Sequence, residues 1–248
     1  EYLGYQLPDG PAPGPAPSPG DHVGVHAQKD GRHYVGFAPT VGRVSGTILN
    51  RVAAAAERVG SQRVRFTPHQ KLLVLDVPAD EVAPLVEELK GLGLHADPSP
   101  FRRHTMACTG IEFCKLAFVD TKDTATATIA ELENRLGDVK LELPITLNLN
   151  GCPNSCARIQ TADIGLKGQI LTGADGEHEF GYQVHLGGGL ASADREDAGL
   201  GRTVRGLKVS ADELPAYVER VVRRFADDHE PGETFSAWAK RSDEDALR

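Results

Sequence analysis

Residues 145–156 read ITLNLNGCPNSC, and the interpretation of the whole chain starts from this stretch. From Ile145 to Leu149 apolar residues alternate with polar ones, which is the period of a strand with one buried face. A glycine and a proline, both typical of turns, follow directly. The pattern therefore predicts a strand that carries Cys152 and Cys156 in a loop at its end.

The chain contains four cysteines, in two short pairs. Five residues separate Cys108 from Cys114, and three separate Cys152 from Cys156. Each pair lies in turn sequence that contains glycine. Four thiolates brought together from two loops form a coordination set for a soft metal or an iron–sulfur cluster.

Four interpretations of these thiols compete on spacing alone. Structural zinc favours two to four residues between ligands, so the second pair fits it and the first fits poorly. Disulfides suit an oxidising compartment, and single buried thiols are a further alternative. An iron–sulfur cluster fits best, because Gly110 and Gly151 allow close approach of a bulky group and Pro153 and Asn154 shape the loop.

Composition limits the class of protein. The 248 residues are 40% hydrophobic and 25% charged, as in ordinary globular proteins, and the formal net charge of −8 disfavours nucleic-acid binding. No apolar run approaches the ~18 residues that span a membrane, and no secretory leader is seen. Reduced thiols suit a cytoplasmic setting.

The start of the chain predicts a linker. Residues 1–20 are rich in Pro, Gly and Ala, and such segments are extended and connect larger pieces. The chain opens at Glu1 and its only methionine is Met106. We therefore expect a processed chain or a fragment of a longer one.

Residues 21–97 alternate strand and helix patterns. The pattern predicts strands near 23–26, 34–37, 64–66 and 72–77, and amphipathic helices near 48–59 and 82–92. Two helices on one face of a small, mostly antiparallel sheet would make a compact unit.

Residues 98–248 form the second predicted unit, with a boundary at the Pro-Ser-Pro of residues 98–100. Beyond the strand near 145–149, helices are predicted near 125–136, 214–225 and 235–240, strands near 164–167 and 182–186, and a glycine turn at 187–189. The expected fold class is α+β, a ferredoxin-like half-domain followed by a cofactor-binding domain.

The motif Cys108-x5-Cys114, followed by NGCPNSCAR at residues 150–158, resembles the signature of the sulfite and nitrite reductases that contain sirohaem and a [4Fe–4S] cluster. The stretch from Gly24 to Arg43 looks like the ferredoxin-like half-domain that precedes the cluster domain in this family. Asn150 and Ser155 stand where some sulfite reductases carry threonine and glycine, and neither departure decides the substrate.

The resemblance implies a role for each motif residue. All four cysteines would ligate the [4Fe–4S] cluster, and the sulfur of Cys156 would also be the axial ligand of the sirohaem iron. Ala107, Gly151 and Asn154 occupy positions that line sirohaem in relatives. Arg102, Arg103 and His104 precede the first pair, and either meet carboxylates of the cofactor or of an acidic ferredoxin, or form a solvated basic turn.

The implied reaction is the six-electron reduction of sulfite to sulfide by an assimilatory enzyme, with ferredoxin as electron donor. The cations that bind the oxyanion come mostly from the first repeat of the family, so we expect no catalytic residue in this half and an N-terminal repeat as partner. Alternatives are a nitrite reductase that forms ammonia, an oxygenase like precorrin-3B synthase, a haem-free iron–sulfur electron-transfer module and, least favoured, a zinc-stabilised binding protein.

Overall fold

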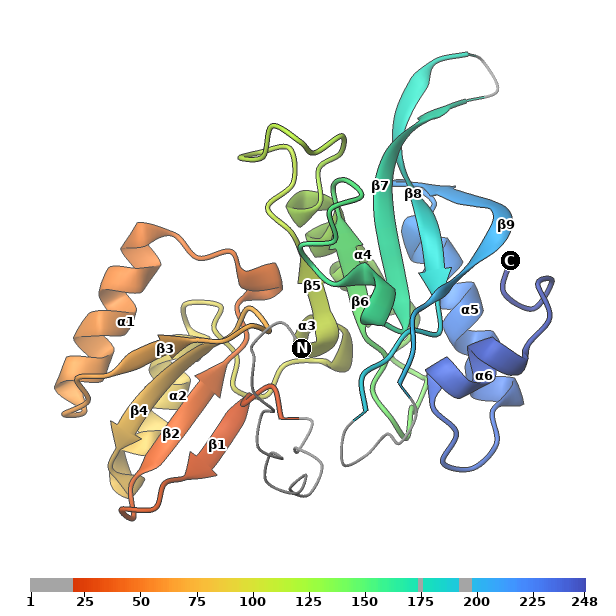
Figure 1. Ribbon diagram of the computed structural model, residues 1–248. Coiled ribbons are helices and arrows are strands. Elements are labelled where there is room, and N and C mark those ends of the chain that lie inside the picture. Colours follow the sequence, from red (N-terminus) through yellow and green to blue (C-terminus); the bar gives the residue numbers. More distant parts are fainter. Residues whose placement is uncertain (1–19, 174–175, 192–197) are drawn as a thin grey trace, which may run out of the picture.

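The computed structural model describes residues 20–173, 176–191 and 198–248, and within them the chain forms two sheets (Figure 1). The expected linker, residues 1–20, lies outside the described residues except for Gly20. Helices together with one antiparallel and one mixed sheet confirm the expected α+β fold class. Among the described residues no helix combines the length and the apolar character needed to cross a membrane.

The first sheet is antiparallel, with the strand order β1-β2-β4-β3. Its elements are β1 Gly24–Ala27, β2 His33–Phe37, α1 Gly46–Arg58, β3 Val64–Phe66, β4 Leu72–Val77 and α2 Val82–Lys90, with 3-10 turns η1 Thr40–Gly42 and η2 Ala79–Glu81. The apolar stripes of both helices pack on one face of this sheet, as their spacing predicted. The core of this unit includes Val35, Phe37, Val52, Val74, Leu85 and Leu89.

Local capping explains where α1 begins and ends. The Ser45 hydroxyl accepts a hydrogen bond from the backbone N–H of Ile48, at 3.2 Å, which satisfies one free donor of the first turn. Gly60 follows the last turn with φ +77°, a conformation that glycine adopts without steric strain.

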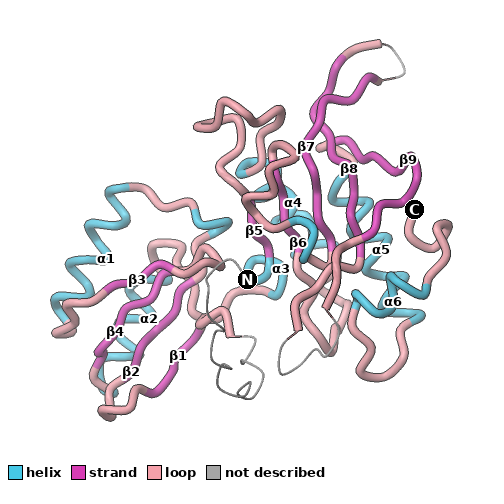
Figure 2. The backbone as a smooth tube through the Cα atoms, viewed as in Figure 1, coloured by secondary structure: helices cyan, strands magenta, loops and turns pink. Residues whose placement is uncertain are grey.

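The second sheet has the order β5-β6-β7-β8-β9 (Figure 2). Strands β5, β6 and β7 are parallel to one another, and β8 is antiparallel to both β7 and β9. Its elements are α3 Pro100–His104, β5 Thr105–Ala107, α4 Lys122–Arg135, β6 Leu147–Asn150, η3 Ile159–Thr161, β7 Ile164–Thr172, β8 His178–Leu186, β9 Arg202–Ser210, α5 Leu214–Asp228 and α6 Phe235–Arg241. Helices α4 and α5 cover one face, where the apolar side chains of β6, β7 and β8 are buried.

The second sheet contains more strand than its sequence pattern predicts. Strands β5 and β9 and the short helix α3 were not predicted, and β7 and β8 are longer than expected. Three residues are too few to show a period, so β5 leaves no signal. In β9 the glycine Gly206 and several charged residues interrupt the apolar pattern. Pairing with neighbouring strands, rather than local sequence, makes these segments strands.

The parallel part of the second sheet positions the cysteine loops. Strands β5 and β6 pair in register from Thr105 with Leu147 to Ala107 with Leu149. Cys108 follows β5 directly and Cys152 follows β6 after one glycine. Because neighbouring parallel strands end at the same edge of a sheet, both loops start side by side.

Candidate functional site

Cys108 is held by backbone contacts between the two strand ends. Its N–H donates to the carbonyl of Leu149 at 2.9 Å, which extends the pairing of β5 with β6 by one residue. Its Sγ accepts a hydrogen bond from the N–H of Gly151 at 3.2 Å. The first cysteine is therefore in contact with the start of the second loop, and an N–H group already points at its sulfur.

Two glycines let the loops pack this closely. A Cβ on Gly151 would lie 2.8 Å from the Cβ of Ala117 and 3.5 Å from the Cα of Gly110. Gly110 itself has φ +71°, and a Cβ there would lie 2.6 Å from the Thr121 hydroxyl. The distances of 2.8 and 2.6 Å are shorter than atoms tolerate in well-packed proteins. The space that we assigned to a cofactor beside these glycines is thus filled, at these points, by residues of the first loop.

Cys114 lies in a turn that is tied back to the second loop. The Cys114 N–H donates to the Gly110 carbonyl at 3.0 Å, and the Phe118 N–H donates to the Gly151 carbonyl at 2.8 Å. The Thr121 hydroxyl closes the loop by donating to the Cys108 carbonyl at 2.7 Å. Residues 108–121 consequently form one hydrogen-bonded loop that ends where α4 begins.

The second loop wraps around a single buried side chain. Asn150 is fully buried, its Oδ1 accepts from the Ala157 N–H at 2.7 Å, and its Nδ2 lies 3.5 Å from the Cys152 carbonyl. Ser155 and Arg158 adopt left-handed backbone conformations, with φ 59° and 56°, that turn the chain back. One asparagine at the end of β6 therefore shapes the loop that carries both cysteines.

The four thiols differ in exposure, and all four are free. Cys152 is buried, Cys108 and Cys114 are half-buried, and Cys156 is exposed. Thiols on two adjoining loops, with an N–H donor at one sulfur, are the type of ligand that iron–sulfur clusters use. In the described part of the chain no three His, Cys, Asp or Glu side chains are grouped to hold a single metal ion.

The other expected cofactor positions surround these loops. Gly151 is buried between them, and Asn154 is exposed in the second loop. Ala107 is fully buried, and its backbone is bound from the first sheet by Gln70, whose Nε2 donates to the Ala107 carbonyl at 2.6 Å. The Gln70 Oε1 accepts from the Ala107 N–H at 3.2 Å. Sequence reasoning missed Gln70, because a glutamine in a turn carries no signal of such a contact.

The basic residues before the first cysteine are engaged within the protein. Arg102 donates to Glu133 at 2.8 Å and to the hydroxyl of Thr40 at 2.6 Å. Arg103 donates to both carboxylate oxygens of Asp21 at 2.8 Å. The contacts with Thr40 and Asp21 connect the second sheet to the first unit. Neither arginine therefore forms the solvated basic turn that was one sequence interpretation.

A buried titratable group lies at the same junction. Burial lowers the pKa of the His104 imidazole to about 4 and that of the Lys71 ammonium to about 8. Burial opposes ionisation of Asp21, but hydrogen bonds from Arg103 and the Val23 N–H hold the pKa of its carboxyl below the usual value. The junction between the sheets therefore depends on protonation.

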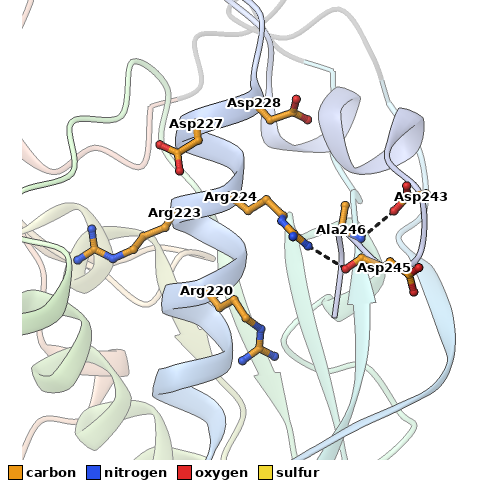
Figure 3. Close-up of a pocket in the computed structure, with 8 residues that line it drawn as sticks. All are labelled: Arg220, Arg223, Arg224, Asp227, Asp228, Asp243, Asp245 and Ala246. Atoms are coloured by element: carbon orange, nitrogen blue, oxygen red, sulfur yellow. Dashed lines mark hydrogen bonds between the residues drawn. The ribbon is translucent and has the colours of Figure 1, made fainter.

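A hollow of about 690 Å³ lies away from the cysteines, between α5 and the C-terminal segment (Figure 3). Its arginines are used inside the fold: Arg224 donates to the Asp245 carbonyl at 2.8 Å, and Arg220 to the Arg248 carbonyl at 2.6 Å. Arg223 pairs with Asp138 at 3.0 Å. The contacts of Arg220 and Arg224 hold the C-terminal residues 245–248 on α5.

Large apolar side chains are exposed on the first cysteine loop. Phe113 is 79% exposed, and three neighbours in the same loop are also exposed: Ile111, Leu116 and Phe118. Figure 1 shows this loop, in yellow-green, reaching beyond the end of β5. Contiguous exposed apolar surface usually marks a place where another molecule or segment packs.

Comparison with protein families covers nearly the whole chain. Residues 26–92 match the nitrite/sulfite reductase ferredoxin-like half domain. Residues 99–248 match the nitrite and sulphite reductase 4Fe-4S domain.

Similar proteins include sulfite reductases that use ferredoxin. Sulfite reductase [ferredoxin] 2 of Mycolicibacterium paratuberculosis is 54% identical over 250 residues, and sulfite reductase [ferredoxin] of Mycobacterium tuberculosis H37Rv is 53% identical. Both alignments cover 100% of this chain and 44% of the relative. An assimilatory ferredoxin-dependent nitrite reductase of Haloferax mediterranei is 36% identical over 92% of this chain and 38% of its own length. The chain thus spans less than half the length of these relatives.

Comparison with solved structures leads to the same family as the sequence comparisons. The Mycobacterium tuberculosis NirA protein superimposes with a TM-score of 0.94 at 53% identity, covering 100% of this chain and 45% of that one. Dissimilatory sulfite reductase I matches with a TM-score of 0.63 at 14% identity, over 87% of this chain and 68% of the other, which shows the shared fold alone.

These matches confirm the resemblance found in the cysteine motif. They also support both expected cofactors, a [4Fe–4S] cluster and sirohaem. The chain belongs to the nitrite and sulphite reductase family.

Proposed function

We propose that this chain is the C-terminal half of an assimilatory, ferredoxin-dependent sulfite reductase, which reduces sulfite to sulfide with six electrons. The relatives at 53–54% identity are named sulfite reductases, whereas those at 32–36% identity are named nitrite reductases. Sirohaem, when bound, would supply the iron at which the oxyanion is reduced. Nitrite reduction to ammonia is the second candidate, and the remaining alternatives gain no support from the named relatives.

The observation that carries the proposal is the meeting of the two cysteine loops at the ends of β5 and β6. Cys108, Cys114, Cys152 and Cys156 would hold the cluster there. The N–H of Gly151, 3.2 Å from the Cys108 sulfur, would stabilise negative charge on that ligand. Hydrogen bonds of this kind tune the reduction potential of iron–sulfur centres.

The exposure of Cys156 supports its assignment as the ligand shared by cluster and sirohaem. Cys152, four residues earlier, is buried, so the second loop turns one thiol inward and the other outward. An outward thiolate is accessible to a second iron. Asn154 and the Gly151 backbone would line the tetrapyrrole, as would the neighbourhood of Ala107.

The chain needs further protein for activity under this proposal. Binding of an oxyanion requires cations, and Arg102 and Arg103 are already paired with Glu133 and Asp21. We assign no catalytic residue to this half. An N-terminal repeat would supply the missing cations and would cover the exposed apolar side chains of the first cysteine loop. We place the enzyme in the cytoplasm, where its thiols stay reduced.

Anaerobic reconstitution tests the cofactor assignment. The chain is loaded with iron, sulfide and sirohaem, and its visible and EPR spectra are recorded. We expect a four-iron cluster coupled to the haem. Cys156→Ser should abolish the coupling, whereas Lys115→Gln, an exposed change in the first loop, should leave it intact. A normal coupled spectrum in Cys156→Ser would refute the bridging role.

The substrate assignment needs the complete enzyme that contains this sequence. Reduced ferredoxin is supplied with sulfite or with nitrite at equal concentration, and sulfide and ammonia are quantified. A higher kcat/KM for sulfite supports the first candidate. A higher kcat/KM for nitrite would replace it with the second.

A further inference from the structure

The face of the second sheet opposite α4 and α5 carries polar side chains from two central strands. Leu166 of β7 and Val184 of β8 are buried toward the helices. Side chains alternate along a strand, so their neighbours point to the other face. We define this open sheet face by Lys167, Gln169, Gln183 and His185, which follow the alternation on β7 and β8.

Strand register places Lys167 next to the second cysteine loop. In the parallel pair β6–β7, Lys167 lies beside Asn150, and in the antiparallel pair β7–β8 it lies beside Gln183. Neighbouring strands are ~4.8 Å apart, so this row extends about 10 Å across the sheet. Asn150 is the residue around which the loop of Cys152 and Cys156 is wrapped. The row therefore begins at that loop and leads away from it.

Two side chains of this face carry a nitrogen atom that is unpaired within the described residues. The Nε2 atoms of Gln169 and His185 are buried and have no hydrogen-bond partner there, although the His185 imidazole is hydrogen-bonded to the backbone of Gly201. No ion pair of Lys167 is found within the described residues, although the lysine is half-buried. Burial and the positive charge of Lys167 both lower the pKa of His185, so the ammonium lies within electrostatic range of the imidazole. Buried polar atoms without partners are rare in native proteins, so each requires an explanation.

A ligand that accepts hydrogen bonds and carries negative charge would satisfy the Gln169 amide and the Lys167 ammonium. Three arginines near the cysteine loops are paired with carboxylates: Arg43 with Glu112 and Asp123, Arg102 with Glu133, and Arg103 with Asp21. Arg158 of the second loop donates to the Pro68 carbonyl at 3.2 Å. Within the described residues Lys167 is a cation beside the site that is paired with no carboxylate. A small oxyanion would sit at the iron itself. Lys167 and Gln183 on adjacent strands and Gln169 two residues further along β7 instead span about 7 Å, which matches groups spread along the rim of a macrocycle.

We propose that Lys167, with the side-chain amides of Gln169 and Gln183, binds peripheral carboxylates of the sirohaem. Sirohaem carries eight carboxylates, and a charge-assisted bond from Lys167 to one of them would orient the macrocycle over the second cysteine loop. The inference rests on the proposed function, since it assumes that sirohaem binds at Cys156. It assigns the non-axial contacts of the cofactor to the open sheet face.

Metal-free porphyrins test these contacts separately from the cysteines, because they have no iron for a thiolate to ligate. The 248-residue chain is titrated with uroporphyrin, which has eight carboxylates, and with coproporphyrin, which has four, while the Soret band is followed. We expect Lys167→Gln to weaken uroporphyrin binding about tenfold and to reduce the preference for uroporphyrin. Lys140→Gln, an equal charge change at an exposed site, should alter affinity less than about twofold.

Each outcome of the titration decides the proposal. Equal affinities of the wild type and Lys167→Gln would overturn it, as would equal losses in Lys167→Gln and Lys140→Gln, which would indicate general electrostatics. Failure of the wild type to bind either porphyrin would overturn it too. Cys156→Ser should retain uroporphyrin binding, so failure of the cysteine assignment and failure of the carboxylate assignment are distinguishable. Thermal unfolding of every variant checks that it is folded.

Discussion

The two cysteine loops start at the same edge of one sheet but are shaped in different ways. The first, residues 108–121, is long and exposes large apolar side chains. It is held by backbone hydrogen bonds and by the close packing of Thr121 against Gly110. The second, residues 151–158, is short and is wrapped around the buried Asn150. Parallel strands can thus place two thiol-bearing loops side by side even though different interactions hold each loop. Substitutions in one loop should therefore leave the other loop intact.

The largest effect is expected from Gly110→Ala in the first loop. The methyl group would lie 2.6 Å from the Thr121 hydroxyl and 2.9 Å from the Thr121 nitrogen, at a φ of +71°. Left-handed strain and overpacking together should lower the free energy of unfolding by about 3 kcal/mol. Urea unfolding measures this value, and reconstituted iron content should fall with it.

Gly93→Ala is the matched control for that change. Gly93 has φ +80° and no atom within 4 Å of the position that a Cβ would occupy. It reports the conformational strain alone, at about 1 kcal/mol. If both variants lose the same stability, the contact between Gly110 and Thr121 does not shape the first loop.

Asn150→Ala should disrupt the second loop while sparing the first. It removes the acceptor for the Ala157 N–H and leaves that buried donor without a partner, which should lower the free energy of unfolding by about 2 kcal/mol. Asn148→Ala removes only a 3.5 Å contact with the Arg158 carbonyl, so a smaller loss is expected. Proteolysis within residues 151–158 should increase in Asn150→Ala, and equal loss in both variants would argue against the special role of Asn150.

The two loops should also differ in their response to pH, because a buried histidine lies in the segment that leads into the first loop. His104 precedes β5, and burial lowers its pKa to about 4 from an ordinary value of 6.5. The unfolded chain therefore takes up a proton first as the pH falls, so the stability supplied by neutral His104 is present above pH 6.5 and is lost as pH falls toward 4. Asp21, Arg103, Lys71 and His69 share this environment.

The pH prediction is checked by unfolding between pH 7 and 4. His104→Asn should flatten the pH dependence over this window, whereas His178→Asn, an exposed change, should not. An unchanged slope in His104→Asn would show that another group is responsible. The effect should be smaller than that of Asn150→Ala, because protonation can be relieved by local opening of the junction.

The smallest effect on the fold is expected in a comparison of the reactivity of the two thiols in the second loop. In the chain without cofactors, exposed Cys156 should react with an alkylating reagent faster than buried Cys152, by about tenfold or more. Peptide mass spectrometry identifies the modified residue. In Asn150→Ala the two rates should converge. Faster reaction at Cys152 in the unaltered chain would contradict the inward and outward arrangement of the two thiols.

The sequence predicted the cysteine-bearing strand, the α+β class and the amphipathic helices, because each has a local period. Its interpretation of Gly110 and Gly151 was incomplete, since the structure shows these glycines making room for loop packing. It missed β5, which has three residues, and Gln70, which binds the edge of that strand from the other sheet. Both depend on which segments become neighbours, and a local pattern contains no such information.

The amino-acid sequence by itself determined the chemistry of this protein: four thiols in two spaced pairs, glycines beside them, and a strand that ends in the second pair. Only the tertiary structure decided that β5 lies parallel to β6, that the Gly151 N–H reaches the Cys108 sulfur, and that Lys167 lies beside Asn150. The physical reason is that donor type and side-chain period are properties of neighbouring residues. Register and edge pairing arise instead from contacts between segments far apart in the chain, which the packing of the whole sheet selects.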